Sequence, residues 1–557
     1  MSGHAEHELM ELGVPPNTDT QANATFKSEH SHPTITQTDS FHDRDADTLA
    51  RLGKRQVLKR RFGLMSMLSF NCTVLVTWEG ILVLFAEGFT NGGPAGLVYG
   101  FIIIWIGTTS IFLTIAELAS MAPTAGGQYH WVFMLAPKSM KKFLSYTTGW
   151  LTVLAWQSLV ASGGYLSGTM IQGLIILNYP NYVPQQWHGT FLFWATILVS
   201  VFVNTVVSSL LPQIEGMIFV LHILGFLAIL VVLSYMAPHA QASEVFTLFL
   251  NQGEWKTQGL SFMIGLIGIS FSFVGADAAV HMSEEIENPS LAVPRSILTS
   301  LTVNGSLGFA ILLATLFGLG DIDTVLKSPT GYPYMEIFLQ ATSSVGGTTA
   351  MSAIVIALAF GSTIGFVATS SRMIWSFARD RGLPFSGFLS KVEPRSSTPI
   401  YAVTVTTVFA CLLALINLGS STVLNDVLSL SIAGFYATYF VAASLLLYNR
   451  CTSAIRSPTP GGLVVSTRDS KSGDFTLVWG PWRIPGSLGI INNVFACAYM
   501  VVVWFFSFWP PTDPTSPSTM NYASLVAGSL ILFSIFYYFM WGRRSYAGPI
   551  VEISSDC

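Results

Sequence analysis

Stretches of about 20 apolar residues recur along almost the whole of this 557-residue chain, and each is long enough to cross the hydrocarbon core of a membrane. Hydrophobic residues make up 51% of the sequence and charged residues only 10%, whereas soluble domains carry roughly a quarter charged residues. A soluble multidomain protein of this length is therefore excluded. The sequence predicts an all-α polytopic membrane protein.

The apolar stretches predict twelve transmembrane helices, the first ten of them within residues 62–448 and the last two within 486–542. We expect a disordered tail over residues 1–61, because it is polar and lacks the apolar core of a signal peptide. A loop follows over 449–485 and a short tail over 543–557. The predicted spans are Leu64–Phe89, Gly96–Leu118, Leu144–Leu177, Thr190–Leu211, Ile214–Met236, Leu260–Val280, Ser296–Leu319, Ala350–Ile374, Pro399–Asn417, Ser421–Tyr448, Leu488–Trp509 and Tyr522–Trp541.

Basic residues divide sharply between the two sides that these spans define. With the N-terminus inside, 24 of the 26 lysines and arginines fall in inner segments, and only Lys256 and Lys327 fall in outer loops. Cytoplasmic loops of membrane proteins carry this excess of positive charge. The distribution predicts that both termini are cytoplasmic.

The sixth span carries the first candidate site. It leads through Ser270, Ser272 and Gly275 to Asp277, an acid at a depth where ionisable groups are costly and usually line a cavity. Serines and glycine favour local unwinding, which membranes tolerate only beside a protein-lined cavity. A broken helix near the midplane is typical of transporter binding sites.

Three motifs next to predicted spans resemble one known family. They are Glu117-Leu118-Ala119-Ser120 with Pro123-Thr124-Ala125-Gly126-Gly127-Gln128-Tyr129, then Glu284-Glu285-Ile286 through Asn288-Pro289 to Pro294, and Ser376-Phe377-Ala378-Arg379-Asp380 through Gly382-Leu383-Pro384. Residues 60–545 thus resemble the amino acid–polyamine–organocation superfamily, most closely the fungal amino acid/choline transporters that include GABA and choline permeases.

The resemblance implies a five-plus-five inverted repeat, over about 62–236 and 258–448, with two further helices. The substrate would lie between interrupted first and sixth spans. Val76-Thr77-Trp78-Glu79-Gly80 is the matching interruption in the first span, as expected where repeats build a site. The candidate substrate-binding residues are Thr77, Trp78, Glu79, Gly80, Trp156, Phe271, Ser272, Gly275 and Asp277.

The chain departs from its wider relatives at the first interruption. Amino-acid permeases usually have a Gly-x-Gly-like break whose free amides hold a substrate carboxylate, whereas this chain has Trp78-Glu79-Gly80. An acid there suits a cationic substrate, with Trp78, Trp156 or Phe271 available for cation–π contact. Packing is the alternative role of each aromatic residue, and a hydrogen bond to a neighbouring helix is the alternative for Glu79.

Two residues are candidates for coupling to protons. His222 lies within the fifth span, where proton-coupled relatives commonly have a lysine, and histidine titrates near physiological pH. A structural histidine bonded to a backbone carbonyl is the alternative. Asp277 is the second candidate, for gating or for response to protons, and the resemblance implies that Phe271 is a gate over the substrate.

The sequence thus predicts a secondary active transporter that imports a small amino acid or amine, such as GABA or choline, by proton symport with alternating access. A nutrient sensor and a uniporter or exchanger of the same fold are the alternatives. The short 281–295 link disfavours a facilitator built from two six-helix halves. We expect substrate, protons and lipid as partners, and no nucleic acid, cofactor, metal or enzymatic activity, since no such motif occurs and the five cysteines lack paired spacing. The plasma membrane is the expected location, with the vacuolar membrane as the alternative.

Overall fold

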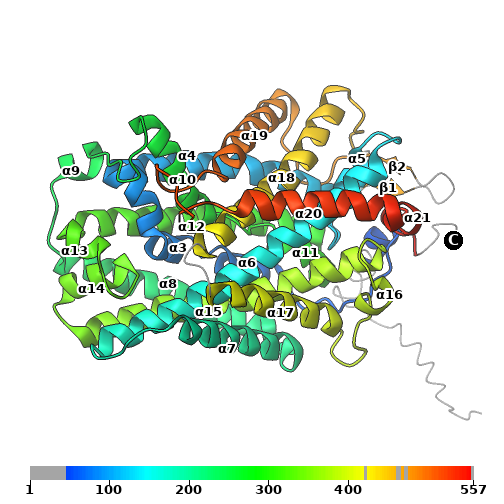
Figure 1. The fold of residues 1–557 in the computed structure, drawn as a ribbon. Helices are drawn as coiled ribbons and strands as arrows, with labels where there is room; N and C mark the ends of the chain where they lie inside the picture. The colour runs from blue at the N-terminus through cyan, green and yellow to red at the C-terminus, as the bar shows by residue number, and fades with distance from the viewer. Residues whose placement is uncertain (1–44, 419–422, 459–465, 469–473, 518, 553–557) are drawn as a thin grey trace, which may run out of the picture.

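The structure is a computed structural model that describes residues 45–418, 423–458, 466–468, 474–517 and 519–552. In this part of the chain, eleven helices are long and apolar enough to cross a membrane. They lie roughly along one axis (Figure 1). These spans are α2 (Leu64–Leu75) with α3 (Thr77–Val83), α4 (Phe85–Met121), α6 (Lys141–Asn178), α7 (Gln186–Thr205), α8 (Leu211–Met236), α12 (Pro289–Phe317), α15 (Val345–Arg379), α17 (Ile400–Ala414), α18 (Val423–Cys451), α19 (Gly486–Phe506) and α20 (Ala523–Tyr537).

The predicted sixth span is broken. Its first part is α10 (Gln258–Phe271), which is too short to cross a membrane alone, and its second part is the single turn α11 (Ala278–His281). Between them Gly275 has a φ of 100°, a conformation that side chains disfavour. This break confirms the interruption expected near Gly275 and Asp277.

The first span breaks at one residue only. Val76 has φ and ψ of 40°, which separates α2 from α3. The side-chain amide of Asn304 lies 3.3 Å from the carbonyl oxygen of Cys72, at the end of α2. Trp78 to Gly80, expected to belong to the interruption, are instead helical.

Short elements gather at the two ends of the bundle. One end carries α9 (Ala242–Thr247), α13 (Ile322–Leu326) and α14 (Pro333–Thr342). The other end, which we call the basic end, carries residues 45–62 and 546–552. It also holds α5 (Gln128–Leu135), α16 (Ser386–Leu389), α21 (Arg543–Ser545) and the antiparallel strands β1 (Thr467–Arg468) and β2 (Phe475–Thr476). The remaining short helices are η1 (Ser208–Leu210), η2 (Ser283–Glu285), η3 (Leu415–Leu418) and η4 (Tyr538–Gly542).

The contacts between spans repeat with an offset of five, as an inverted repeat requires. The first span packs against the seventh through α2 and α12, and the sixth against the second through α10 and α4. Likewise α6 contacts α7 and α18. Its counterpart in the second repeat, α15, contacts the counterparts of those two helices, α17 and α8. The last two spans, α19 and α20, pack on the outside of this core against α18.

The N-terminal tail corrects one expectation. Residues 1–44 lie outside the described residues, but residues 45–61, expected to be disordered, are ordered at the basic end. Phe62 pairs through its backbone with Glu285 and Glu287, and its ring packs at 5.7 Å from that of Phe70. The tail is therefore part of the folded domain from residue 45 onward.

Candidate functional site

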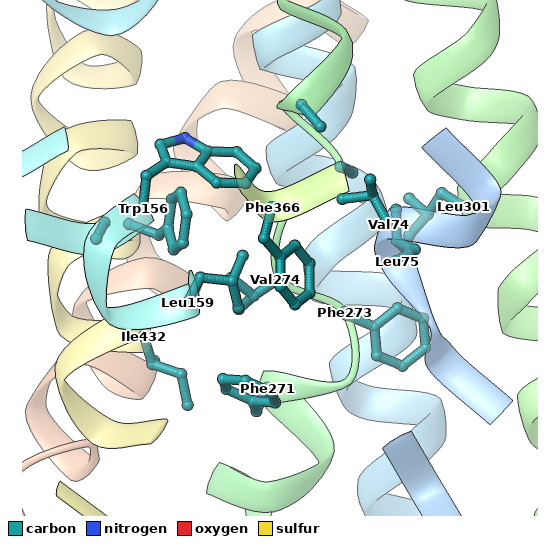
Figure 2. Packing of buried hydrophobic residues seen from close by; sticks show 14 of the residues in the cluster. Val74, Leu75, Trp156, Leu159, Phe271, Phe273, Val274, Leu301, Phe366 and Ile432 are labelled. Atoms are coloured by element: carbon teal, nitrogen blue, oxygen red, sulfur yellow. The ribbon is translucent and has the colours of Figure 1, made fainter. Parts of the chain in front are cut away.

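A cavity lies between the two broken spans. Figure 2 shows apolar side chains from α2, α6, α10 and α15 converging there, Phe271, Val274 and Phe366 among them. Apart from Glu79, Ser272 and Ser362, every lining residue is apolar. The lining consists of Val74, Leu75, Val76, Glu79, Gly80, Val83, Leu84, Leu159, Gly163, Leu166, Met170, Phe271, Ser272, Val274, Ala359, Ser362 and Phe366.

Glu79 is the one carboxylate in this lining. It lies in the first turn of α3 and is 1% exposed. Its Oε1 lies 2.6 Å from Nδ1 of His222 on α8, and its Oε2 has no hydrogen-bond partner among the described residues. One carboxylate oxygen is thus held by the histidine while the other is available to a ligand.

Glu79 and His222 can share a proton. The indole N–H of Trp78 also approaches Nδ1 of His222, at 3.1 Å. An indole nitrogen can only donate, and Nδ1 carries either one proton or one lone pair. If Nδ1 accepts from Trp78, the carboxyl of Glu79 must be the protonated partner; if Nδ1 is protonated, it donates to an ionised Glu79. In both arrangements, one hydrogen lies between Oε1 of Glu79 and Nδ1 of His222.

Trp78 itself points away from the cavity. Its ring packs against His222 and, at 6.1 Å between centroids, against Phe226. It fixes the histidine and has no access to a ligand in the cavity. Trp78 therefore lies outside the cavity lining, and its cation–π role stays a prediction.

Gly80, Phe271 and Ser272 bring the two broken spans into contact. A methyl group at Gly80 would lie 2.7 Å from Oγ of Ser272, so only glycine permits this approach. All three residues line the cavity, as does Glu79. Phe271 ends α10 beside the break, where the resemblance implies a gate.

The other expected residues lie outside the lining. Thr77 is buried toward α12, next to Gly308, and Gly275 sets the backbone of the break behind Leu159. Trp156 packs edge-on against His281 and Phe435. Asp277 is buried and accepts a hydrogen bond from Gln128 at 2.6 Å. The structure thus separates these four residues from the cavity.

Glu215, a fully buried acid near the start of α8, was not among the predicted site residues. Its Oε2 lies 2.5 Å from Oγ1 of Thr73 on α2, and its Oε1 has no hydrogen-bond partner in the described part of the chain. The hydroxyl of Thr73 also lies 2.9 Å from the carbonyl of Phe70. A hydroxyl has one proton to give, and a buried ionised acid is costly, so this arrangement favours a protonated Glu215 that donates to Thr73. An acid inside a predicted span was the available signal.

A second cavity leads toward the end of the bundle that carries α13 and α14. It shares Val83 and Leu84 with the first cavity, and tyrosines, glutamine and an acid line it. Its polar lining residues are Glu87, Tyr165, Thr169, Gln172, Thr330 and Tyr332. The second cavity thus adjoins the first on the side away from the basic end.

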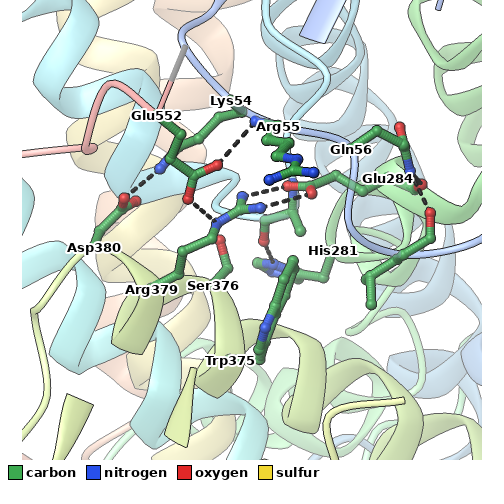
Figure 3. Close-up of polar contacts among 12 residues, drawn as sticks. Lys54, Arg55, Gln56, His281, Glu284, Trp375, Ser376, Arg379, Asp380 and Glu552 are labelled. Carbon is green, nitrogen blue, oxygen red and sulfur yellow. Dashed lines mark hydrogen bonds and ion pairs between the residues drawn. The ribbon is translucent and has the colours of Figure 1, made fainter. Parts of the chain in front are cut away.

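The basic end is closed by buried ion pairs (Figure 3). Lys54 from the N-terminal tail pairs with Asp380, and Arg379 makes two hydrogen bonds, of 2.9 and 2.6 Å, to Glu284. Arg372 pairs with Glu285 at 2.8 Å. Burial alone would raise the pKa of Asp380, but the neighbouring charges of Lys54 and Arg379 outweigh it and lower that pKa below its ordinary value. This carboxyl therefore stays ionised.

The C-terminal segment completes this closure. The backbone of Glu552 donates to the carbonyl of Gly53 at 2.7 Å, and its side chain accepts from the backbone of Arg55 at 2.8 Å. The amide of Ile550 donates to Asp380 at 2.8 Å. Both ends of the described chain thus meet on the same ion pair.

Comparison with known proteins agrees with this architecture. A family model described as amino acid permease matches residues 62–533. The choline transporter of Saccharomyces cerevisiae is 30% identical over 493 residues, which cover 88% of this chain and 83% of that protein. Amino-acid permease 2 of Neurospora crassa is 26% identical over 513 residues, which cover 90% and 89%.

A plant protein is similar over a comparable number of residues. Amino-acid permease BAT1 of Arabidopsis thaliana is 26% identical over 528 residues, which cover 91% of this chain and 96% of that protein. The family match extends over most of the chain and includes both broken spans and the cavity between them. The chain belongs to the amino acid permease family of the amino acid–polyamine–organocation superfamily, among its fungal amino acid/choline transporters.

Proposed function

We propose that this chain imports a small substrate with an exposed ammonium group, such as choline, GABA or a related amine or amino acid, by proton symport with alternating access. The basic end would face the cytoplasm and both termini would lie there, most simply at the plasma membrane. The positive-inside distribution of 24 of 26 lysines and arginines supports this orientation.

One observation carries the proposal: the cavity holds a single carboxylate with one unengaged oxygen in an otherwise apolar lining. Such a surface would bind a cation through Glu79 and accommodate its apolar body against Phe271 and Phe366. Cation–π contact with either ring would add to the binding. A neutral amide of similar size would gain neither the ionic contact nor the cation–π contact.

The pairing of Glu79 with His222 supports coupling to protons. When a proton resides on His222, Glu79 is ionised and its Oε2 can hold the substrate ammonium, so that proton and substrate occupy the site together. A carboxylate that contacts a protonated histidine through one oxygen and a substrate ammonium through the other would hold both at once, as symport requires.

A uniporter or exchanger would use the same cavity without net proton movement, and a nutrient sensor would bind without moving substrate. The two ends of the bundle bear on this choice: a second cavity adjoins the site toward one end, while ion pairs lie at the other. This arrangement favours a transporter over a sensor.

The test is uptake of radiolabelled choline and GABA into permease-deficient yeast that expresses the full chain. Uptake should rise with an inward proton gradient and be independent of sodium. Glu79→Gln should weaken substrate binding and so raise the apparent KM about 10- to 150-fold, the equivalent of roughly 1.5–3 kcal/mol for a hydrogen bond to a charged group. His222→Ala should lose accumulation but keep exchange.

Glu244→Gln, which changes an exposed acid on α9, is the matched control and should leave the apparent KM unchanged. Surface expression of every variant is measured alongside. Unchanged affinity in Glu79→Gln would show that this acid is structural, and sodium-dependent uptake would exclude proton symport.

A further inference from the structure

A second buried pair of an acid and a histidine lies at the other helix break. Asp277 precedes α11 and His281 ends it, so one helical turn brings their side chains together. Oδ2 of Asp277 lies 3.4 Å from Nε2 of His281, and both side chains are fully buried. Neither residue lines the central cavity, and the proposed mechanism uses neither.

Hydrogen counting assigns one proton to this pair. Nδ1 of His281 lies 2.9 Å from the carbonyl oxygen of Ala125, which can only accept, so Nδ1 carries a hydrogen. Nε2 of His281 and Oδ1 of Asp277 have no hydrogen-bond partner among the described residues. An ionised Asp277 would therefore be a buried carboxylate without a counter-charge, unless His281 carries a second proton. The closed arrangement is therefore favourable only with a proton on Asp277 or on Nε2.

The surroundings offer this pair no other charge. Gln128 of α5 donates to Asp277, and the hydroxyl of Tyr439 on α18 also faces Asp277. Trp156 of α6 covers the ring of His281. The two arginines of α15 are paired with the two acids of η2, Arg372 with Glu285 and Arg379 with Glu284. The elements in contact with α11 otherwise offer the buried thiol of Cys72 on α2 and the exposed Arg295 on α12.

One residue links this pair to the ion pairs of the basic end. The carbonyl of Ala125 accepts from His281, while the amide of the same residue faces Oε1 of Glu284 at 3.3 Å. Glu284 in turn holds Arg379. Figure 3 shows His281 directly beside this network. A movement of α11 away from α5 would therefore disturb the closure of the basic end.

We propose that Asp277 and His281 form a second proton-holding site, which keeps the basic end closed while it holds its proton and opens that end when the proton leaves. The pair would release its proton to the cytoplasm at the step where substrate leaves. This inference rests on the proposed function for the identity of the release side, but its test needs no substrate.

The experiment measures access to Ser283, which is fully buried on η2 beyond the pair. Ser283→Cys is introduced into the full chain in nanodiscs, with Cys451 kept and the other native cysteines replaced by serine. A polar methanethiosulfonate reagent labels both thiols at pH 5.5 to 8.0, and mass spectrometry quantifies each. Because Cys451 is exposed, the ratio of the two rates removes the pH dependence of thiol chemistry itself.

The ratio should rise with pH, by up to about tenfold per pH unit, the slope of one titrating proton. Asp277→Asn can donate to His281 but cannot lose a proton, so its ratio should stay low at every pH. Glu79→Gln should keep the rise, because it removes only the first pair.

A ratio independent of pH in the parent background would overturn the inference, as would an undiminished rise in Asp277→Asn. If Asp277→Asn does not fold, the parent titration decides alone. Loss of proton-driven uptake with this titration intact would instead reject the proposed function and leave the second site standing.

Discussion

At the scale of single residues, three buried acids lack a lysine or arginine partner in the described part of the chain. Glu79 and Asp277 each face a histidine, whereas Glu215 faces only the hydroxyl of Thr73. An acid with a histidine can hold its proton on either group. Glu215 has no such choice, so its own carboxyl must carry the proton while it remains buried.

If Glu215 is protonated in the folded protein, replacement of this acid by glutamine should be tolerated. Glu215→Gln has the shape of a protonated carboxyl and can donate to Thr73, so the free energy of unfolding should change by less than about 1 kcal/mol. Glu215→Ala should cost about 2–5 kcal/mol through the cavity it leaves, as buried truncations do. Thermal unfolding of the purified protein in detergent measures both. A large gain of stability in Glu215→Gln would indicate instead that the acid is ionised in the folded protein.

At the scale of elements, the helical period explains which predicted residues line the site. Because only Val76 leaves the helix, α3 presents one face to the cavity, at Glu79, Gly80 and Val83. A longer interruption, as expected from the sequence, would have exposed Thr77 and Trp78 as well. The same period places Leu159 and Gly163 of α6 at the cavity and Trp156 a turn away.

The spans, both helix breaks and the acid at the first break could therefore be predicted from the sequence. Hydropathy, glycine and a charged residue within an apolar stretch are all local signals. The sequence did not predict which face of α3 turns toward the cavity, because that face depends on the backbone torsions of a single residue, Val76. Glu215 was missed because an acid close to the end of a predicted span resembles an interfacial residue. The order of residues 45–61 was missed because their partners are far along the chain, at Asp380 and Glu552.

The close approach of α3 to the second break predicts a steric effect. Gly80→Ala places a methyl group 2.7 Å from Oγ of Ser272 and should cost about 1–3 kcal/mol of stability, with loss of uptake, because the cavity wall must shift. Ser272→Gly in the same chain should restore much of both. Gly259→Ala on α10, where nothing lies within 4 Å, is the matched control. Thermal unfolding and choline uptake are the measurements, and equal behaviour of the two alanine variants would contradict the contact.

At the scale of the whole molecule, the two ends of the described chain meet on α15 and close one end of the bundle. Asp380 receives Lys54 from the N-terminal segment and the amide of Ile550 from the C-terminal segment. At the opposite end, the second cavity lies between α6 and residues 330–333. Alternating access requires that the two ends open in turn.

The pair of Lys54 and Asp380 should govern the stability of this closed end. Asp380→Asn leaves a buried lysine without a counter-charge and should cost about 3–5 kcal/mol, whereas Lys54→Met with Asp380→Leu should recover most of it. The pKa of Asp380 is lowered in the folded protein, so the pair stabilises the fold above the ordinary aspartate pKa of about 4 and loses this contribution as pH falls further. Thermal unfolding at pH 3 to 7 should therefore show a stability difference between the parent and Asp380→Asn that shrinks at the acid end. Glu244→Gln, far from this pair, should follow the parent at every pH. A difference that does not depend on pH would mean that Asp380 acts through its shape and its hydrogen bond to Ile550, and not through its charge.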